Sequence, residues 1–215
     1  MHDKTIIVLT QNPSGLTCQN CLRHIERHTK NYELFVVRQE PRDFGFAHEI
    51  NRIVKIAETN NIVLINDDCF VQKKWYEKMD NMKADITGGL CGMEYEKYVC
   101  FALALIRKST FQKIGYLNEN YKFGYEDTEY CIRAMQAGLI VTNTNTHSRH
   151  LKAKSSFGFK QFNDKINGSL LYWRNKNPIF QYGVIVFILI VDTVNHFAGR
   201  TGLVKFFLPI LRRLV

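Results

Sequence analysis

The sequence predicts an α/β fold, with a mixed, mainly parallel β-sheet flanked by helices. Two observations support this prediction. Short β-branched runs alternate with segments whose apolar residues recur every three or four positions, through roughly the first 90 residues. The chain also has 215 residues, of which 46% are hydrophobic and 13% aromatic, enough to cover both faces of a sheet. Ligands of such sheets bind beyond the carboxyl ends of the strands, so functional residues are expected there.

The first third of the chain contains three predicted strands and two predicted helices. The strands are the apolar runs Thr5–Thr10, Tyr32–Val37 and Asn61–Ile65. A helix is predicted over Leu16–His28, after the break at "QNPSG", and a second one where apolar residues recur between Ala47 and Ala57. This alternation is typical of parallel strands joined by helical crossovers.

The following segment continues the pattern less regularly. "WYEKM" predicts the start of a helix, and Tyr98–Arg107 predicts a longer strand. A further helix is predicted over "TEYCIRAMQAG", with Gly138 just past its end, and the next residues, "LIVT", predict a short strand.

Residues 179–215 are predicted to form an appendage to the domain at residues 1–178. The apolar run Tyr182–Val191 is too short to span a bilayer, which takes about 20 apolar residues. After Arg200, large apolar residues are mixed with Lys and Arg, a composition typical of a segment that lies on a membrane surface. The alternative is a helical pair packed on the domain or in a homodimer interface.

Charge and cysteine usage limit the function classes. The net charge of +9, from 29 Lys and Arg against 20 Asp and Glu, favours anionic partners such as nucleotides or anionic lipid. The basic residues form no continuous run, so nucleic acid is not the expected partner. Cys18 and Cys21 form a C-x-x-C pair without a second pair, which we interpret as two thiols one turn apart on a helix. Because no charged-then-apolar leader precedes the first strand, we expect a cytoplasmic protein with reduced thiols, peripheral at the cytoplasmic face of a membrane.

Two adjacent carboxylates follow the buried strand that ends at Ile65. Asp67 and Asp68, preceded by Asn66, would repel each other and lose hydration unless a positive charge compensated them. A hard cation such as Mn²⁺ or Mg²⁺, shared with substrate phosphates, would do so. The alternative is a turn or a helix cap, since Asn and Asp favour both.

A second acidic pair, Glu126 and Asp127, stands at the start of a predicted helix. Carboxylates are favoured at helix N-termini, so capping is one explanation. The other is catalysis, because a carboxylate near a bound sugar can serve as the general base for a hydroxyl nucleophile.

These segments, in this order, resemble the inverting family 2 glycosyltransferases, which have the GT-A fold. "ALIRKSTFQKIGYLNENYKFGYEDTEYCIRAMQAG" is similar to the acceptor half of that family. "GFAHEIN" followed by "IVLINDD" is similar to the donor half with its Asp-x-Asp motif, and "HLKAKSS" to a late His and Ser loop. The resemblance covers about residues 4 to 175.

The resemblance implies roles for the acidic residues. Asp68 matches the direct metal ligand and Asp127 the catalytic base, while Glu126 would help to hold the acceptor. His150 matches the late histidine that touches the metal or the diphosphate, and His147 is a weaker match. A solvated surface histidine is the alternative for either one. The expected donor-binding residues are Thr10, Asn12, Arg38, Gly45, Asn51, Asn66 and Asp67.

One segment departs from the family pattern. The family carries an Asp that reads the nucleobase soon after the second strand, where this chain has Arg38 and Gln39, and Asp43 is displaced from that position. This departure weakens the expectation of a uracil donor. An Arg at the entrance could meet phosphate instead.

The implied function is metal-dependent transfer of a sugar, with inversion, from a nucleotide-diphosphate donor to a hydroxyl of a glycan or lipid-linked acceptor. The first alternative is a GT-A domain that binds a nucleotide sugar or glycan without turnover. A nucleotidyltransferase is less favoured, because "TQNPSGLT" after the first strand has one Gly and no basic residue.

Overall fold

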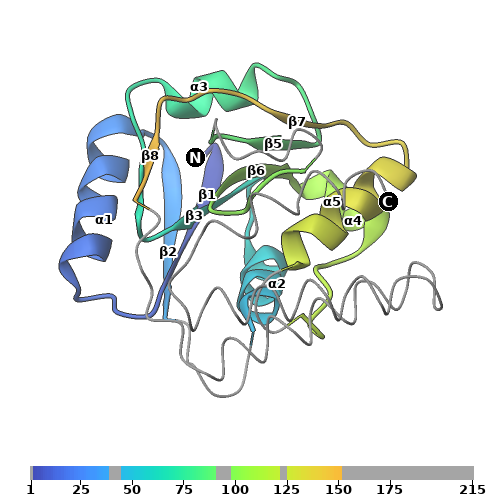
Figure 1. The fold of residues 1–215 in the computed structure, drawn as a ribbon, viewed down its shortest axis with the longest axis horizontal. Coiled ribbons are helices and arrows are strands. Elements are labelled where there is room, and N and C mark those ends of the chain that lie inside the picture. Colours follow the sequence, from blue (N-terminus) through green and yellow to red (C-terminus); the bar gives the residue numbers. More distant parts are fainter. Residues whose placement is uncertain (1, 39–44, 91–97, 122–124, 152–215) are drawn as a thin grey trace, which may run out of the picture.

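The computed structural model describes residues 2–38, 45–90, 98–121 and 125–151. A central sheet lies between two layers of helices (Figure 1). The strands are β1 (Lys4–Thr10), β2 (Tyr32–Arg38), β3 (Asn61–Asn66), β4 (Cys69–Phe70), β5 (Ile86–Gly88), β6 (Leu103–Arg107), β7 (Val141–Asn143) and β8 (Arg149–His150). The helices are α1 (Leu16–His28), α2 (Phe46–Ile56), α3 (Trp75–Asp80), α4 (Lys108–Ile114) and α5 (Glu126–Gln136).

Six strands form the main sheet in the order β2-β1-β3-β6-β5-β7, and β4 pairs with β8 in a separate two-stranded sheet. β1 is parallel to β2 and β3, and β5 is parallel to β7, whereas β6 is antiparallel to both of its neighbours. Because β6 runs the opposite way, the residues that precede it lie at the edge where β1, β2 and β3 end. The predicted mixed, mainly parallel sheet is therefore confirmed.

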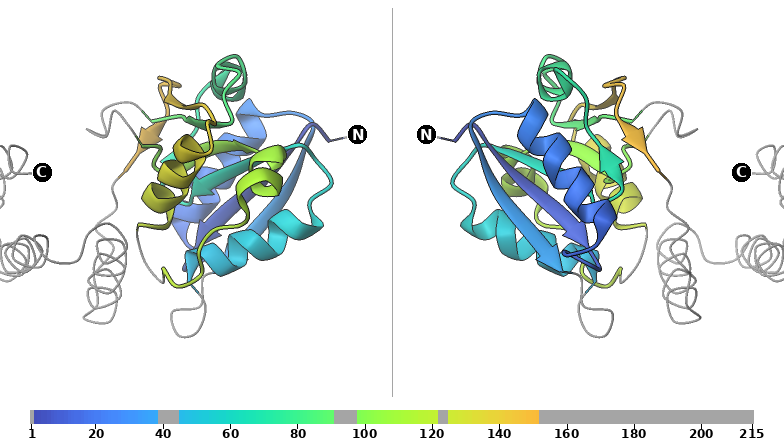
Figure 2. Two further views of the ribbon diagram at one scale, coloured as in Figure 1. Left: turned by 90° about the vertical axis from the view of Figure 1, so that its right-hand side faces the viewer. Right: turned by 90° about the vertical axis from the view of Figure 1, so that its left-hand side faces the viewer.

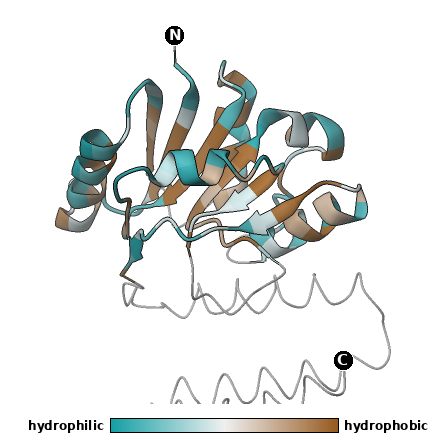
Figure 3. Ribbon diagram, turned by 90° about the horizontal axis from the view of Figure 1, so that it is seen from above, coloured by the Kyte–Doolittle hydropathy of each residue, from teal (hydrophilic) through white to brown (hydrophobic). Residues whose placement is uncertain are grey.

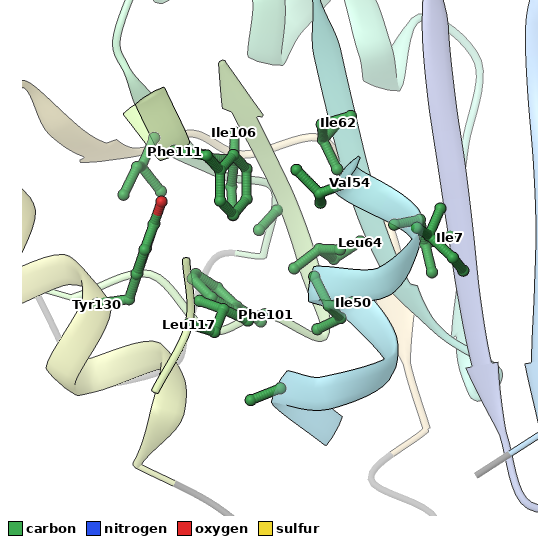
Figure 4. Packing of buried hydrophobic residues seen from close by; sticks show 14 of the residues in the cluster. Ile7, Ile50, Val54, Ile62, Leu64, Phe101, Ile106, Phe111, Leu117 and Tyr130 are labelled. Atoms are coloured by element: carbon green, nitrogen blue, oxygen red, sulfur yellow. The ribbon is translucent and has the colours of Figure 1, made fainter. Parts of the chain in front are cut away.

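The core has two halves, one on each face of the sheet, because successive residues of a strand point to opposite faces. On one face Ile7, Leu64 and Ile106 pack under α2, α4 and α5 (Figure 2, left; Figure 4). On the other face Val8 and Ile65 pack against α1 and α3. The right-hand view of Figure 2 shows this face, with α1 in front. The hydrophobic residues accordingly concentrate in the central strands (Figure 3). Such a doubly covered sheet fixes its carboxyl edge rigidly.

Most of the predicted elements occur where the sequence places them. The exception in length is the strand predicted over Tyr98–Arg107, of which only Leu103–Arg107 is β6, because a largely buried turn, in which Leu103 N–H donates to Cys100 O, precedes it. The sequence does not predict β5, α4, or the β4–β8 pair. Gly138 follows α5 with φ 75°, the left-handed conformation expected of a helix-ending glycine.

Several predictions fall outside the described residues: Gln39, Asp43 and the whole appendage at 179–215. Within the described ranges, no helix combines the length and the apolar character needed to cross a membrane.

Candidate functional site

Three polar residues end the parallel strands side by side. Thr10 of β1 is in register with Arg38 of β2, and Leu9 of β1 is in register with Asn66 of β3. The chain order reverses between β1 and β3, since β2 lies on one side of β1 and β3 on the other. Such a reversal opens a crevice at the carboxyl ends of the strands. The predicted donor-binding residues Thr10, Arg38 and Asn66 therefore share this edge.

Asp67 is fixed across the reversal point. Its backbone N–H donates to Leu9 O at 3.2 Å, and the Thr10 hydroxyl donates to its Oδ2 at 2.5 Å. The same hydroxyl accepts the Asn12 N–H at 3.1 Å. Burial raises the pKa of Asp67; the Thr10 hydrogen bond opposes this shift and the charge of Asp68 adds to it. Thr10 thus holds Asp67 and the start of the following loop together.

Asp68 points to the two-stranded sheet and meets His150. Its Oδ1 lies 3.1 Å from His150 Nε2, and both side chains are largely buried. The pairing of Cys69 with His150 across β4 and β8 brings the two residues together, and Leu151 N–H donates to Asp68 O at 3.0 Å. Of the two candidate histidines, His150 is therefore the one in contact with Asp68, whereas His147 lies in an exposed turn.

The donor atoms near Asp68 fit a hard divalent cation. The pair offers one carboxylate and one imidazole, both ordinary ligands of such ions. Two further buried atoms, Asn66 Oδ1 and His150 Nδ1, have no hydrogen-bond partner among the residues described. The described ranges contain no group of three or more Asp, Glu, His or Cys side chains that could hold a metal. A cation bound here would take its remaining ligands from a substrate and from water, which Mg²⁺ commonly does.

Asp127 reaches the same edge from the start of α5. The turn that precedes β6 lies at this edge, because the N–H of Asn66 at the end of β3 donates to Ala102 O at 3.0 Å. The backbone N–H groups of Thr128, at 2.7 Å from Oδ1, and of Phe101 bind the Asp127 carboxylate. Burial nevertheless raises the pKa of Asp127 above its ordinary value, and these N–H groups only partly oppose the shift.

The thiol of Cys100 is within electrostatic reach of both acidic sets. Burial raises the pKa of Cys100 to about 11, and the negative charges of Asp127, Glu126 and Asp68 contribute to the shift. All three carboxylates therefore act on one side chain at the carboxyl edge of the sheet. The sequence does not identify Cys100, because it falls inside the strand predicted over Tyr98–Arg107.

The other predicted site residues have different surroundings. Glu126 is buried at the first position of α5, and Gly45 precedes α2 as its N-cap. Asn51 is buried within α2, where its amide group binds the segment after α4. Its Nδ2 donates to Leu117 O and to Glu119 Oε1, both at 2.9 Å, and its Oδ1 accepts Leu117 N–H at 3.0 Å. Asn51 therefore has no N–H left for a donor substrate.

Cys18 and Cys21 both lie on α1 with fully buried side chains, as the helical interpretation of the pair predicts. The Cys21 thiol donates to Asn66 O at 3.7 Å, and burial raises its pKa strongly. The pair is thus part of the core beneath the site.

No protein-family model matches this chain, and no curated protein is significantly similar to it. Among solved structures, the mannosyltransferase PcManGT from Pyrobaculum calidifontis, in complex with GDP-Man and Mn²⁺, is similar over 87% of this chain and 69% of its own, with a TM-score of 0.60 and 11% identity. TarS from S. aureus is similar over 67% of this chain with a TM-score of 0.50 and 13% identity, and the chain spans 35% of TarS. Identities this low show the fold alone, and that fold is the expected GT-A-like arrangement.

Proposed function

We propose that this chain is a glycosyltransferase that moves a sugar, with inversion, from a nucleotide-diphosphate donor to a hydroxyl acceptor. The observation that carries the proposal is the contact of Asp68 with His150, 3.1 Å apart, directly after the strand end that borders the crevice between β1 and β3. The fold is shared with a mannosyltransferase that binds GDP-Man and Mn²⁺, which supports a nucleotide-sugar donor. The two acidic sets would then divide the work, one toward the donor and one toward the acceptor.

On the donor side, Asp68 and His150 would hold Mn²⁺ or Mg²⁺. The bound ion would supply positive charge against the leaving diphosphate. Asn66 Oδ1, a buried acceptor, would receive a hydroxyl of the ribose or the sugar. Thr10 would keep Asp67 oriented at the crevice, because its hydroxyl already donates to that carboxylate.

On the acceptor side, Asp127 would act as general base. Its ionised carboxylate takes the proton of the acceptor hydroxyl as that oxygen bonds to the anomeric carbon, while the bond from this carbon to the diphosphate oxygen breaks and its electrons leave with the diphosphate. The N–H groups of Thr128 and Phe101 hold the carboxylate in position. Glu126, adjacent on the first turn of α5, would help to hold the acceptor.

A second candidate function is binding of a nucleotide sugar or glycan without turnover. The absence of the family's nucleobase-reading Asp favours this candidate, because β2 ends at Arg38, near the position where that Asp is expected. The presence of both Asp68 and Asp127 favours catalysis instead, since binding alone needs no general base.

We further propose that the acceptor is lipid-linked and that the protein is peripheral at the cytoplasmic face of a membrane. The apolar and basic composition of residues 179–215 supports this proposal. The competing arrangement places the same segment in a homodimer interface.

A screen of nucleotide sugars by thermal melting, with Mn²⁺ and with chelator, tests the proposal. A true donor at about a hundred times its dissociation constant should add about 2.7 kcal/mol to the free energy of unfolding, and only in the presence of the metal. The stabilising donor is then incubated with lipid-linked and glycan acceptors, and product is measured. Stabilisation without any transfer would favour the binding function; absence of both would refute the site.

A further inference from the structure

The outer side of α1 carries a basic ridge. Its inner residues Cys18, Cys21 and Ile25 face the core, so Leu16, Asn20, Arg23 and Arg27, spaced by three or four positions, line the opposite side. Both arginines are exposed, and the apolar side chain of Leu16 is 73% exposed. The acidic residue of this helix, Glu26, is exposed and within electrostatic reach of Tyr32 of β2.

The two-stranded sheet extends this ridge. Neighbouring pairs in a ladder point to opposite faces, so the pair Cys69–His150 faces inward; in the other pair Arg149 is exposed, whereas Phe70 is half-buried against the core. The Phe70 ring stacks on His24 of α1 with centroids 5.2 Å apart, and His24 Nδ1 is 3.0 Å from Val71 O. Arg149 is therefore joined to the α1 ridge through Phe70 and His24, and β8 lies beside α1 in Figure 1.

Positive charge dominates this surface. His28, at the end of α1, has a pKa below its ordinary value. Desolvation is the largest cause, and the nearby positive charges of His24, Arg27 and Lys73 lower the pKa of His28 further. In the described part of the chain, none of Arg23, Arg27, Lys73 and Arg149 forms an ion pair. Such a gathering of like charges costs free energy through repulsion, which an anionic surface would remove.

We propose that the basic ridge, made of Arg23, Arg27, Lys73 and Arg149 with the exposed apolar side chain of Leu16, docks this domain on an anionic membrane. Basic side chains around an apolar contact are what an interfacial surface requires, because the charges meet the headgroups while the apolar groups enter below them. None of these residues belongs to the appendage at 179–215.

The position of the ridge gives the docking a consequence. His150 lies on the face of the two-stranded sheet opposite Arg149, so a membrane on the ridge would bring the candidate site close to a lipid-linked acceptor. Only this consequence rests on the proposed function; the docking itself requires no turnover.

Vesicle co-sedimentation of the full chain tests the proposal without donor or metal. The parent should bind phosphatidylcholine vesicles that contain phosphatidylglycerol and should not bind pure phosphatidylcholine. The double variant Arg27→Gln/Arg149→Gln should lose about 25-fold in partition coefficient, about fivefold for each charge. The control Lys55→Gln/Lys113→Gln loses the same net charge from exposed positions on α2 and α4, which cover the opposite face of the sheet, and should stay within about twofold of the parent. Melting curves verify that both variants fold.

Three results would overturn the docking surface. Equal weakening in both double variants would mean that net charge rather than the ridge drives binding. Undiminished binding of Arg27→Gln/Arg149→Gln would assign the membrane contact to another segment. Ridge-dependent binding to a DNA duplex with no binding to vesicles would identify nucleic acid as the partner. None of these results bears on sugar transfer, which is measured separately.

Discussion

Asn51 is the residue for which sequence and structure suggest different roles. The resemblance assigns it to the donor, whereas its amide binds the backbone of Leu117 twice and the Glu119 carboxylate once. In Asn51→Ala all three hydrogen bonds disappear, each worth about 1 kcal/mol net. The N–H and C=O of Leu117 also stay buried without this partner. The free energy of unfolding should therefore fall by at least about 3 kcal/mol.

Urea unfolding measures this loss, and Arg52→Ala provides the control on the same helix. Arg52 is exposed and pairs with Glu49 at the surface, so its removal should cost at most about 0.5 kcal/mol. Donor affinity of the folded Asn51→Ala protein should match that of the parent. A loss of stability below about 1 kcal/mol together with a large loss of donor affinity would refute the structural role of Asn51.

Three further predictions concern the base, the thiols and the appendage. In the proposed mechanism transfer needs ionised Asp127, whose pKa is raised above its ordinary value of 3.8, so kcat/KM should rise with pH through that raised pKa; an acid limb at or below pH 3.8 would exclude Asp127 as the base. The same burial opposes ionisation in the folded state, so the contribution of Asp127 to stability should fall as pH rises from 3.8 to the raised pKa, and the free energy of unfolding of the parent minus that of Asp127→Asn should decrease over this interval. Chelators should leave the melting transition unchanged, because Cys18 and Cys21 are core residues of α1; zinc lost together with the fold would contradict this. Deletion of residues 179–215 should weaken binding to anionic vesicles while the melting transition persists, whereas insolubility would show that the segment belongs to the core.

The sequence predicts the long elements well, because periodicity reports burial. Leu16–His28 is helical as predicted, since its buried residues recur at three- and four-residue spacing. The same signal fails at Tyr98–Arg107, where the apolar run is buried over most of its length but only its second half is a strand. A buried turn and a buried strand look alike in hydropathy, and here the turn is what carries Cys100 toward Asp127.

Short elements leave too little pattern to be detected. β5 has three residues, Ile86–Gly88, too few for an alternating pattern, and a Cβ on Gly88 would stand 2.0 Å from Asn143 Oδ1, so the Asn143 side chain occupies the space beside this glycine. β4 and β8 have two residues each and lie far apart in the chain. No local signal predicts that pairing. The contact between Asp68 and His150 therefore could be anticipated only through the family resemblance.

The division of labour between the two acidic sets is the central claim, and two near-isosteric variants test it. Asp68→Asn should weaken donor binding in Mn²⁺ by at least the 10–100-fold that loss of a supporting outer-shell partner typically costs, and transfer should fall with it. Asp127→Asn should bind donor as the parent does while transfer falls by about 10²–10⁴-fold, as expected for loss of a general base. Donor affinity by calorimetry is measured beside product formation for both variants. Equal loss of donor affinity in the two, or unchanged transfer by Asp127→Asn, would contradict the account.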